Sequence, residues 1–255
     1  MVTRKDYAAP SVFEPKALLR EARRQKGLAA TDVPRLCILD PDGDIVGHLR
    51  REGRARPFQE WPCYHTEMDA FELGNETAGI IGRAVGAPFA VLIAEQLFAS
   101  GCELLISVTS AGQIHAVADP PYFVLIDRAL RDEGTSHHYA AAEEFAEADP
   151  RIIAAAERAA KAAGLTTFVG GSWTTDAPFR ETAQAIADAK AKGVLAVEME
   201  AAALYTFARV AGTKVLCIAH VTNTMGQAAG DFEKGEADGA AASLRLLQGI
   251  AAELR

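Results

Sequence analysis

The feature that most constrains the fold of this chain is a short apolar run that passes through two carboxylates directly into an alanine-rich segment. Residues 193–205 read GVLAVEMEAAALY. Side chains alternate between the faces of a strand, so Glu198 and Glu200 share one face and Met199 takes the other. A helix that begins at Ala201 favours anions at its N-terminus. We therefore expect two carboxylates and a thioether at the mouth of one crevice.

The same two acids have a simpler interpretation. Acidic residues are common in the first turn of a helix, where they complement its dipole and have no further role. On the pattern alone, this interpretation is favoured for Glu198 and Glu200.

Apolar strand-like runs alternate with helical runs from Leu36 to the C-terminus. This alternation predicts an α/β sandwich with a mixed or partly parallel sheet and ligands at the carboxyl ends of its strands. The chain has 255 residues and 49% are hydrophobic, enough for one large domain. We expect this domain over residues 35–255, after an N-terminal arm of residues 1–34. Within the arm, a basic helical run ends at Gly27, and further along the chain Asp149 and Pro150 start an alanine-rich helix.

Composition excludes several classes of partner. The net charge of −8 and a pI near 5.3 mean that the average surface would repel nucleic acid and an anionic membrane. The four cysteines are scattered without a CxxC motif, which is typical of reduced thiols in the cytoplasm. No apolar stretch reaches the length of a membrane span. We expect a soluble cytoplasmic protein without a structural metal site.

Several motifs resemble one known family. Residues 197–203, VEMEAAA, resemble the signature of the nucleoside phosphorylase superfamily, which includes purine nucleoside phosphorylases, uridine phosphorylases and methylthioadenosine nucleosidases. Residues 131–139, RDEGTSHHY, are similar to another run of this family. The resemblance implies a three-layer sandwich with a mixed central sheet and cleavage of an N-glycosidic bond in nucleoside salvage. It also implies inorganic phosphate as co-substrate, no cofactor, and a homo-oligomer.

The resemblance assigns the ribose site to the organising run. In the family the second glutamate, here Glu200, holds the ribose hydroxyls, with Met199 and Glu198 beside it. A carboxylate that faces the growing positive charge of the ribose stabilises the transition state more than the ground state, as catalysis requires.

Residues 109–113, TSAGQ, follow the expected strand 104–108 as a small-residue loop. Such a loop brings backbone N–H groups and a hydroxyl close to a ligand, although a tight turn is an equal alternative on sequence alone. The family has Gly-Thr/Ser-x-Gly here, so the resemblance assigns phosphate binding to Ser110 and Gly112. Ser107 stands where phosphorylases usually carry a phosphate-binding arginine.

The family's first phosphate loop is also altered. Its pattern is Gly-Asp-Pro-x-Arg, whereas residues 39–43 read LDPDG, so the glycine and the arginine are both absent. A basic loop that follows is more often simply solvated. The arginines that remain as candidate cations are Arg50, Arg51, Arg54, Arg56 and Arg83.

Residues 170–182, GGSWTTDAPFRET, resemble the family's base-recognition loop. Phe179 is suited to stacking on a base and Arg180 to donating to a carbonyl oxygen, with Asp176 in the same site. The alternative is a plain helix N-terminus capped by Thr175 or Asp176, with Trp173 in the core.

The strand 214–221 leads to Asn223, where purine-cleaving members have an aspartate that protonates the leaving base. Uridine phosphorylases have asparagine there, so the chain most resembles them. They follow it with an arginine, where this chain has Thr224. The resemblance therefore makes Glu200, Asn223 and Arg180 the catalytic candidates.

Two questions remain open at this stage. His137 and His138 are adjacent and point in different directions, so hydrogen-bonded loop histidines are favoured over a metal pair. The altered phosphate motifs leave three hypotheses: phosphorolysis, which is slightly favoured, a hydrolytic nucleosidase, and a non-catalytic nucleoside-binding protein.

Overall fold

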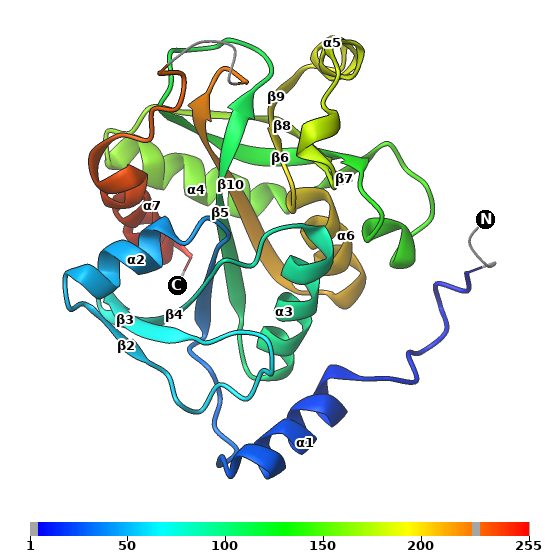
Figure 1. The fold of residues 1–255 in the computed structure, drawn as a ribbon, viewed down its shortest axis with the longest axis vertical. Helices are drawn as coiled ribbons and strands as arrows, with labels where there is room; N and C mark the ends of the chain where they lie inside the picture. Colours follow the sequence, from blue (N-terminus) through cyan, green and yellow to red (C-terminus); the bar gives the residue numbers. More distant parts are fainter. Residues whose placement is uncertain (1–4, 226–229, 255) are drawn as a thin grey trace.

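A mixed central sheet organises the computed structural model, which describes residues 5–225 and 230–254. The described residues form ten strands in the order β10-β6-β8-β9-β5-β1-β4-β3-β2, with β7 paired to β6 (Figure 1). The strands are β1 (Leu36–Asp40), β2 (Ala55–Pro57), β3 (Asp69–Leu73), β4 (Glu76–Gly82), β5 (Leu104–Gln113), β6 (Tyr122–Asp132), β7 (Phe145–Glu147), β8 (Thr167–Thr175), β9 (Val194–Glu198) and β10 (Lys214–Asn223).

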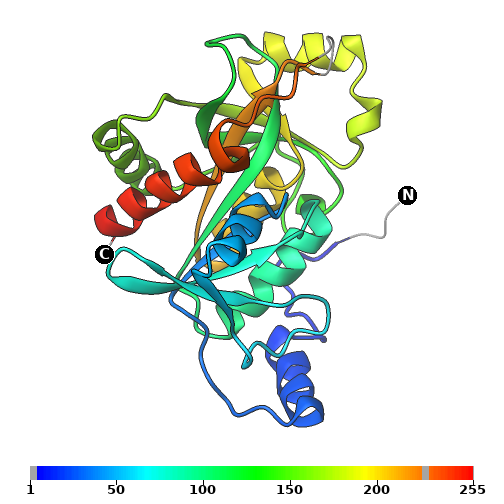
Figure 2. The same cartoon turned by 60° about the vertical axis from the view of Figure 1, so that its left-hand side comes forward.

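Helices cover both faces of this sheet. They are α1 (Pro15–Lys26), α2 (Asp44–Arg51), α3 (Ala87–Ala99), α4 (Pro150–Ala162), α5 (Ala183–Ala191), α6 (Ala201–Ala211) and α7 (Ala240–Glu253). One apolar core contains buried side chains of α3 and α6, and a second contains those of α2, α4 and α7. Helices α4 and α7 lie side by side (Figure 2). The predicted three-layer sandwich is confirmed.

Part of the sheet closes on itself. Strand β5 pairs in parallel with β1 and β10 and antiparallel with β9. Together with the β10–β6, β6–β8 and β8–β9 pairings, this makes a closed ring of five strands. The ring brings the ends of β5, β9 and β10 together, and the candidate site lies there.

Several strands are longer than the sequence predicted. Thr109–Gln113 belong to β5 and Gly170–Thr175 to β8, so both predicted loops were wrong over these residues. The reason is pairing with distant strands, because β5 is paired with β10 up to the Asn223 and Gly112 pair, with a shift of register between Val221 and Asn223. Likewise, β8 is paired with β6 as far as Thr175.

The predicted basic loop was also wrong. Arg50 and Arg51 lie in α2, a helix that buries Ile45, Val46 and Leu49 against the sheet. The apolar positions are few and the segment is short, so its helical period was weak.

Predicted helix ends are mostly confirmed. Gly27 ends α1 in the left-handed conformation with φ 66°, and α6 begins at Ala201 as expected. Asp149 caps α4 by accepting a hydrogen bond from the Arg151 N–H. These signals are local, so the sequence alone predicts them.

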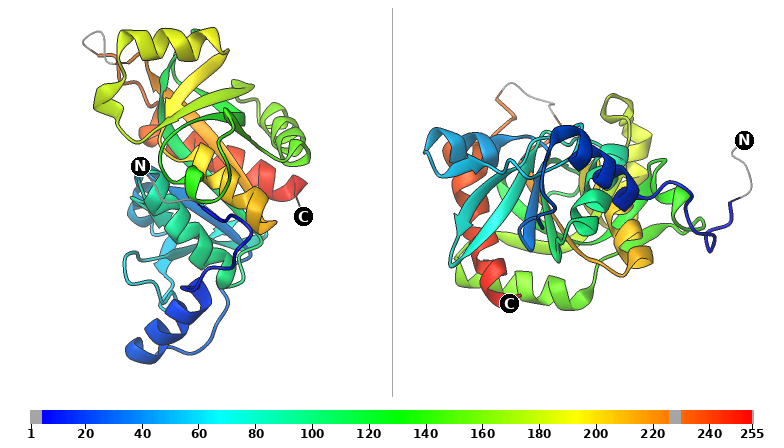
Figure 3. Two further views of the ribbon diagram at one scale, coloured as in Figure 1. Left: turned by 90° about the vertical axis from the view of Figure 1, so that its right-hand side faces the viewer. Right: turned by 90° about the horizontal axis from the view of Figure 1, so that it is seen from below.

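The N-terminal segment reaches the main body at two places. Helix α1 packs on α3 and buries Leu19 and Ala22 (Figure 3). Further upstream, Lys5 Nζ donates to the His137 carbonyl at 2.5 Å. Residues 1–4 of the predicted arm and Gly226 lie outside the described residues. No helix in the described part of the chain is long and apolar enough to cross a membrane.

Candidate functional site

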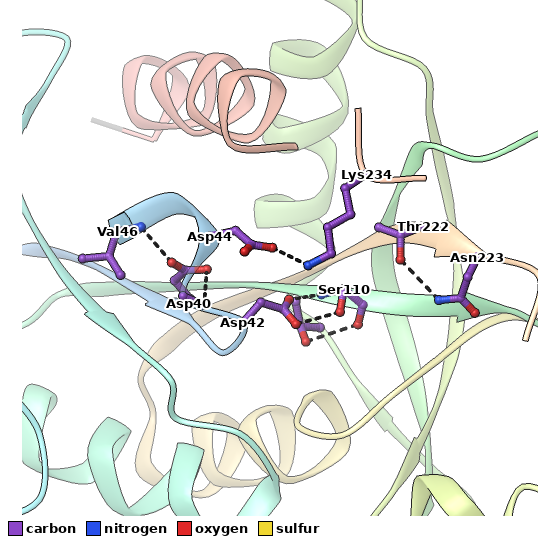
Figure 4. A network of polar contacts seen from close by, with 10 residues as sticks. Asp40, Asp42, Asp44, Val46, Ser110, Thr222, Asn223 and Lys234 are labelled. Carbon is purple, nitrogen blue, oxygen red and sulfur yellow. Dashed lines mark hydrogen bonds and ion pairs between the residues drawn. The ribbon is translucent and has the colours of Figure 1, made fainter. Parts of the chain in front are cut away.

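The candidate site lies where β1, β5 and β10 end beside the β9–α6 junction. These three strands run parallel in the order β1, β5, β10, so their carboxyl ends meet at one edge. Figure 4 shows the residues of this edge: the Asp42 carboxylate faces Ser110, and Asn223 lies further along β10. Ligands of α/β sheets bind at such an edge.

Glu198, the last residue of β9, is fully engaged inside the protein. Its Oε1 accepts hydrogen bonds from Ser172 Oγ at 2.9 Å and Thr174 Oγ1 at 2.5 Å. Its Oε2 accepts the backbone N–H groups of Glu200 and Ala201, both at 2.7 Å. Burial raises the pKa of Glu198, and these donors oppose the shift. The carboxylate therefore fixes the start of α6.

Glu200 is equally buried but only half satisfied. Its Oε1 accepts the Gly86 N–H at 2.7 Å, whereas Oε2 is buried and has no partner at hydrogen-bond geometry among the described residues. The Thr109 hydroxyl lies near enough to lower the pKa of this carboxyl, but it donates to the Ser110 carbonyl at 3.3 Å. Burial, followed by the charge of Glu198, raises the pKa of Glu200 to about 8. An unpaired buried acceptor is costly, so a ligand group that donates to Oε2 would stabilise the site.

Met199 lies between these acids and is partly exposed, so the three residues share one junction as expected. The strand ends at Glu198, however, and Glu200 takes the N-cap position of α6 with φ −132° and ψ −35°. The two carboxylates thus belong to a strand end and a helix cap rather than to one strand face.

Ser110 on β5 binds an acid of its own chain. Its backbone N–H donates to Asp42 Oδ2 at 2.6 Å, and its Oγ donates to Oδ1 at 2.8 Å. Both donors of Ser110, which the resemblance assigned to phosphate together with Gly112, are therefore used by a carboxylate from the turn after β1. The neighbouring Asp40 is buried, and burial raises its pKa to about 7.

Sequence reasoning missed His220 and Lys234, which lie beside this contact. His220 is opposite Ser110 in the β10–β5 register and stacks on Phe123, with burial lowering its pKa to about 4. Lys234 Nζ is 2.5 Å from Asp44 Oδ2. Neither residue belongs to a motif, and only the repeated aspartates of residues 40–44 were a signal for charge at this place.

Asn223 and Gly112 form an adjacent pair at the ends of β10 and β5. Asn223 Oδ1 accepts the Met225 N–H at 2.9 Å, and Nδ2 donates to Thr222 Oγ1 at 3.2 Å. A Cβ on Gly112 would lie 2.5 Å from Met225 Sδ and 3.1 Å from Val197 Cγ1, so a larger residue would displace these side chains. The structure thus brings the predicted residues Ser110, Gly112 and Asn223 together.

The predicted base-binding residues lie between β8 and α5. Phe179 and Arg180 are in the short helix η2 (Pro178–Arg180), and both are exposed. Asp176 Oδ2 accepts the Gly134 N–H at 2.8 Å. Within the described residues, no hydrogen bond or ion pair joins Arg180 to Ser110, Gly112 or Asn223.

The alternative for this segment was half right. Trp173 is buried, and its Nε1 donates to Asp132 Oδ2 at 2.9 Å. However, Thr182 caps α5 by accepting the Ala185 N–H, so the expectation that Thr175 or Asp176 caps the helix is wrong.

The candidate arginines have different surroundings. Arg50 is paired with Asp69 Oδ2 at 2.6 Å and is therefore engaged on the sheet. Arg83 lies over the altered first loop, since a Cβ on Gly43 would lie 3.2 Å from its Cγ. The Arg83 backbone N–H also donates to the Asp40 carbonyl at 3.0 Å, so this candidate is in contact with that loop.

The two adjacent histidines have different surroundings. His137 Nδ1 lies 3.3 Å from Nη2 of the buried Arg131, which agrees with a hydrogen-bonded histidine, and His138 is exposed. Across residues 5–225 and 230–254, no group of three or more His, Cys, Asp or Glu side chains is arranged to hold a metal ion.

Comparisons with known proteins agree on one family. Residues 35–252 match the model of the phosphorylase superfamily. The chain is 28% identical over 218 residues to a uridine phosphorylase of Thermococcus kodakarensis, covering 77% of each chain. It is 28% identical to a DeoD-type purine nucleoside phosphorylase of Roseobacter denitrificans, covering 66% of this chain and 78% of that one. A uridine phosphorylase structure from Vibrio fischeri matches the fold with a TM-score of 0.73 and 22% identity, covering 87% of this chain and 95% of that one.

Proposed function

Because the chain belongs to the phosphorylase superfamily, we propose that it cleaves the N-glycosidic bond of a nucleoside with inorganic phosphate. The products are a free base and a pentose 1-phosphate. Inorganic phosphate is the co-substrate, and no cofactor takes part. The named relatives, uridine and purine nucleoside phosphorylases, support this reaction.

The observation that carries the proposal is the unpaired Oε2 of Glu200. It is a buried acceptor without a donor among the described residues, and the 2′ and 3′ hydroxyls of a ribose are donors. Once ionised, the carboxylate opposes the positive charge that grows on the sugar as the base departs. Met199 packs beside the sugar, and Glu198 acts through its bonds to the start of α6.

Base binding is assigned to the segment after β8 and to the end of β10. Phe179 stacks on the base, and Arg180 donates to a carbonyl oxygen, with Asp176 and Asn223 completing the site. Phe179 is 99% exposed, so a base that covers it would bury apolar surface. Asn223 has no acidic proton for a purine ring nitrogen, so we propose a pyrimidine nucleoside as substrate.

Phosphate binding is assigned to Ser110 and to the Gly112 backbone. A buried phosphate needs cations or several oriented N–H groups to replace its hydration. Arg83 is the candidate cation because it contacts the loop after β1. We also propose a cytoplasmic homo-oligomer in which a neighbouring subunit can supply a further cation.

A nucleoside panel tests this function. The protein is incubated with uridine, thymidine, inosine and adenosine, with and without phosphate, and free base is quantified. The proposal expects release of uracil or thymine that depends on phosphate. Cleavage of inosine or adenosine without activity on uridine would refute the pyrimidine preference. Binding without any base release would instead indicate a non-catalytic nucleoside-binding protein.

A further inference from the structure

We propose that Asp42 is a built-in competitor of the phosphate co-substrate, so that phosphate reaches Ser110 only by displacing the Asp42 carboxylate. The inference rests on the proposed function, which places phosphate at Ser110. It makes Asp42 a residue that sets the affinity for phosphate, a role that no family motif assigns to this position.

The contact between the two residues has the form of an anion site that is already filled. Each carboxylate oxygen of Asp42 takes one donor of Ser110, the N–H at 2.6 Å and the hydroxyl at 2.8 Å (Figure 4). Two charge-assisted bonds to one anion are strong, and a second anion at these donors must break both. A free Ser110 and a bound Asp42 are therefore mutually exclusive states.

Asp42 is able to leave without unfolding its loop, because a different aspartate holds the turn. The Gly43 N–H donates to the Asp40 carbonyl at 2.9 Å and to Asp40 Oδ1 at 3.2 Å. The Val46 N–H donates to Asp40 Oδ2 at 2.8 Å. Asp40 is buried, whereas Asp42 is partly exposed. Among the described residues, the Asp42 side chain thus hydrogen-bonds to Ser110 alone.

The charge of Asp42 affects the pKa values of two neighbouring groups, Glu200 and Lys234. The charge of Asp42 is among the causes, after burial and Glu198, that raise the pKa of Glu200. Burial lowers the pKa of Lys234, but the hydrogen bond with Asp44 and the charges of Asp42 and Asp44 outweigh it, and the net shift is upward. A phosphate at Ser110 beside a retained Asp42 would meet like charge at short range. Removing the Asp42 charge therefore favours phosphate in two ways: it frees the donors and it removes repulsion.

The test measures the affinity for inorganic phosphate by isothermal titration calorimetry in the whole protein, without relying on turnover. Asp42→Asn is nearly isosteric and removes the charge, and Asp42→Ala removes the acceptor as well. Both should bind phosphate at least about tenfold more tightly than the unmodified protein, because a charge-assisted pair no longer competes. The KM for phosphate should fall in parallel and by more than the KM for nucleoside changes, since Asp42 is assigned no nucleoside contact and reaches Glu200 only through its charge.

Two controls separate competition from general electrostatics. Glu52→Gln removes an equal charge from the exposed C-terminal end of α2 and should leave phosphate affinity unchanged. Ser110→Ala removes a hydroxyl that donates either to the Asp42 carboxylate or to phosphate. The gain in phosphate affinity from Asp42→Asn should therefore be smaller in the Ser110→Ala background. The inference is overturned if Asp42→Asn and Asp42→Ala bind phosphate no more tightly than the unmodified protein. An equal gain in Glu52→Gln, or an undiminished gain without the hydroxyl, also overturns it.

The same measurements distinguish a failure of the competitor role of Asp42 from a failure of phosphorolysis. Tighter phosphate binding in Asp42→Asn, together with base release that never depends on phosphate, supports the competitor role and refutes phosphorolysis. Phosphate-dependent turnover with unchanged affinity in both Asp42 variants refutes the competitor role and leaves phosphorolysis standing. If neither the unmodified protein nor any variant binds phosphate, both are refuted.

Discussion

The backbone N–H of Glu200 donates a hydrogen bond to Oε2 of Glu198 at 2.7 Å. This bond separates the roles of the two acids at the β9–α6 junction. The two carboxylate oxygens of Glu198 accept hydrogen bonds from four internal donors. In Glu200, by contrast, one buried oxygen is unpaired within the described residues. One carboxylate builds the junction, and the account assigns the chemistry to the other.

Replacing Glu200 by glutamine should remove most of the activity and leave the fold intact. The amide can still accept the Gly86 N–H, but it has no charge to oppose the oxocarbenium ion. We expect the turnover number to fall by about a hundredfold or more, as for other groups that stabilise transition-state charge. Circular dichroism and base release are measured on the same sample. Near-normal turnover in the folded variant would contradict the role of Glu200.

The pH dependence of the reaction should report the ionisation of Glu200. Burial and the charge of Glu198 raise its pKa to about 8, so much of it holds a proton at neutral pH. If the ionised form is the active one, kcat/KM should rise with pH and level off above about pH 8 in the free enzyme. The measurement is kcat/KM for nucleoside at saturating phosphate. If kcat/KM rises with pH in the same way in Glu200→Gln, the ionisation that controls it belongs to another group.

Glu200 should also make stability depend on pH. The folded protein keeps the Glu200 proton up to about pH 8, whereas the unfolded chain loses it near the ordinary value of 4.5. Folding therefore takes up a proton between these values, and stability falls as pH rises through that window. Glu200→Gln removes this dependence, so its Tm relative to the unmodified protein should rise between pH 5.5 and pH 8.5. For a chain of this size, about 2–4 °C corresponds to each kcal/mol. A constant difference in Tm across that range would contradict the raised pKa.

Replacing Glu198 should act first on stability. Glu198→Ala leaves the donors of Ser172, Thr174 and the start of α6 without their buried acceptor. Each unsatisfied buried donor costs about 1–3 kcal/mol, so a loss of several kcal/mol in the free energy of unfolding is expected. Chemical denaturation measures it, with Glu157→Gln on the exposed side of α4 as a control that should change little. Equal stability of the two variants would show that Glu198 does not hold the junction.

The sequence predicted the parts of the fold that depend on local signals. The alternation of apolar runs indicated the sandwich, and Gly27 and Asp149 marked helix ends because capping involves only neighbouring residues. Strand lengths were underestimated because the ends of β5 and β8 are fixed by partners far along the chain. The closed ring of strands has no local signal at all.

The sequence predicted the motif residues of the candidate site but not the contacts between distant residues. Resemblance pointed to Glu200, Ser110 and Asn223, and the structure places Ser110 and Asn223 on paired strands. The contact of Asp42 with Ser110 joins residues 68 positions apart, and no spacing rule relates a turn aspartate to a distant strand. Likewise, Lys234 reaches Asp44 across 190 positions. Long-range polar pairs of this kind follow from the tertiary fold.

The central claim is that the nucleoside is split by phosphate, and the products of the reaction test it most directly. Uridine is incubated with the protein in phosphate buffer and in phosphate-free buffer, and the sugar product is identified by phosphorus NMR and by a reducing-sugar assay. The account predicts ribose 1-phosphate in amounts equal to the uracil released, and little release without phosphate. Equally fast release in phosphate-free buffer, with free ribose as the product, would contradict it and identify a nucleosidase.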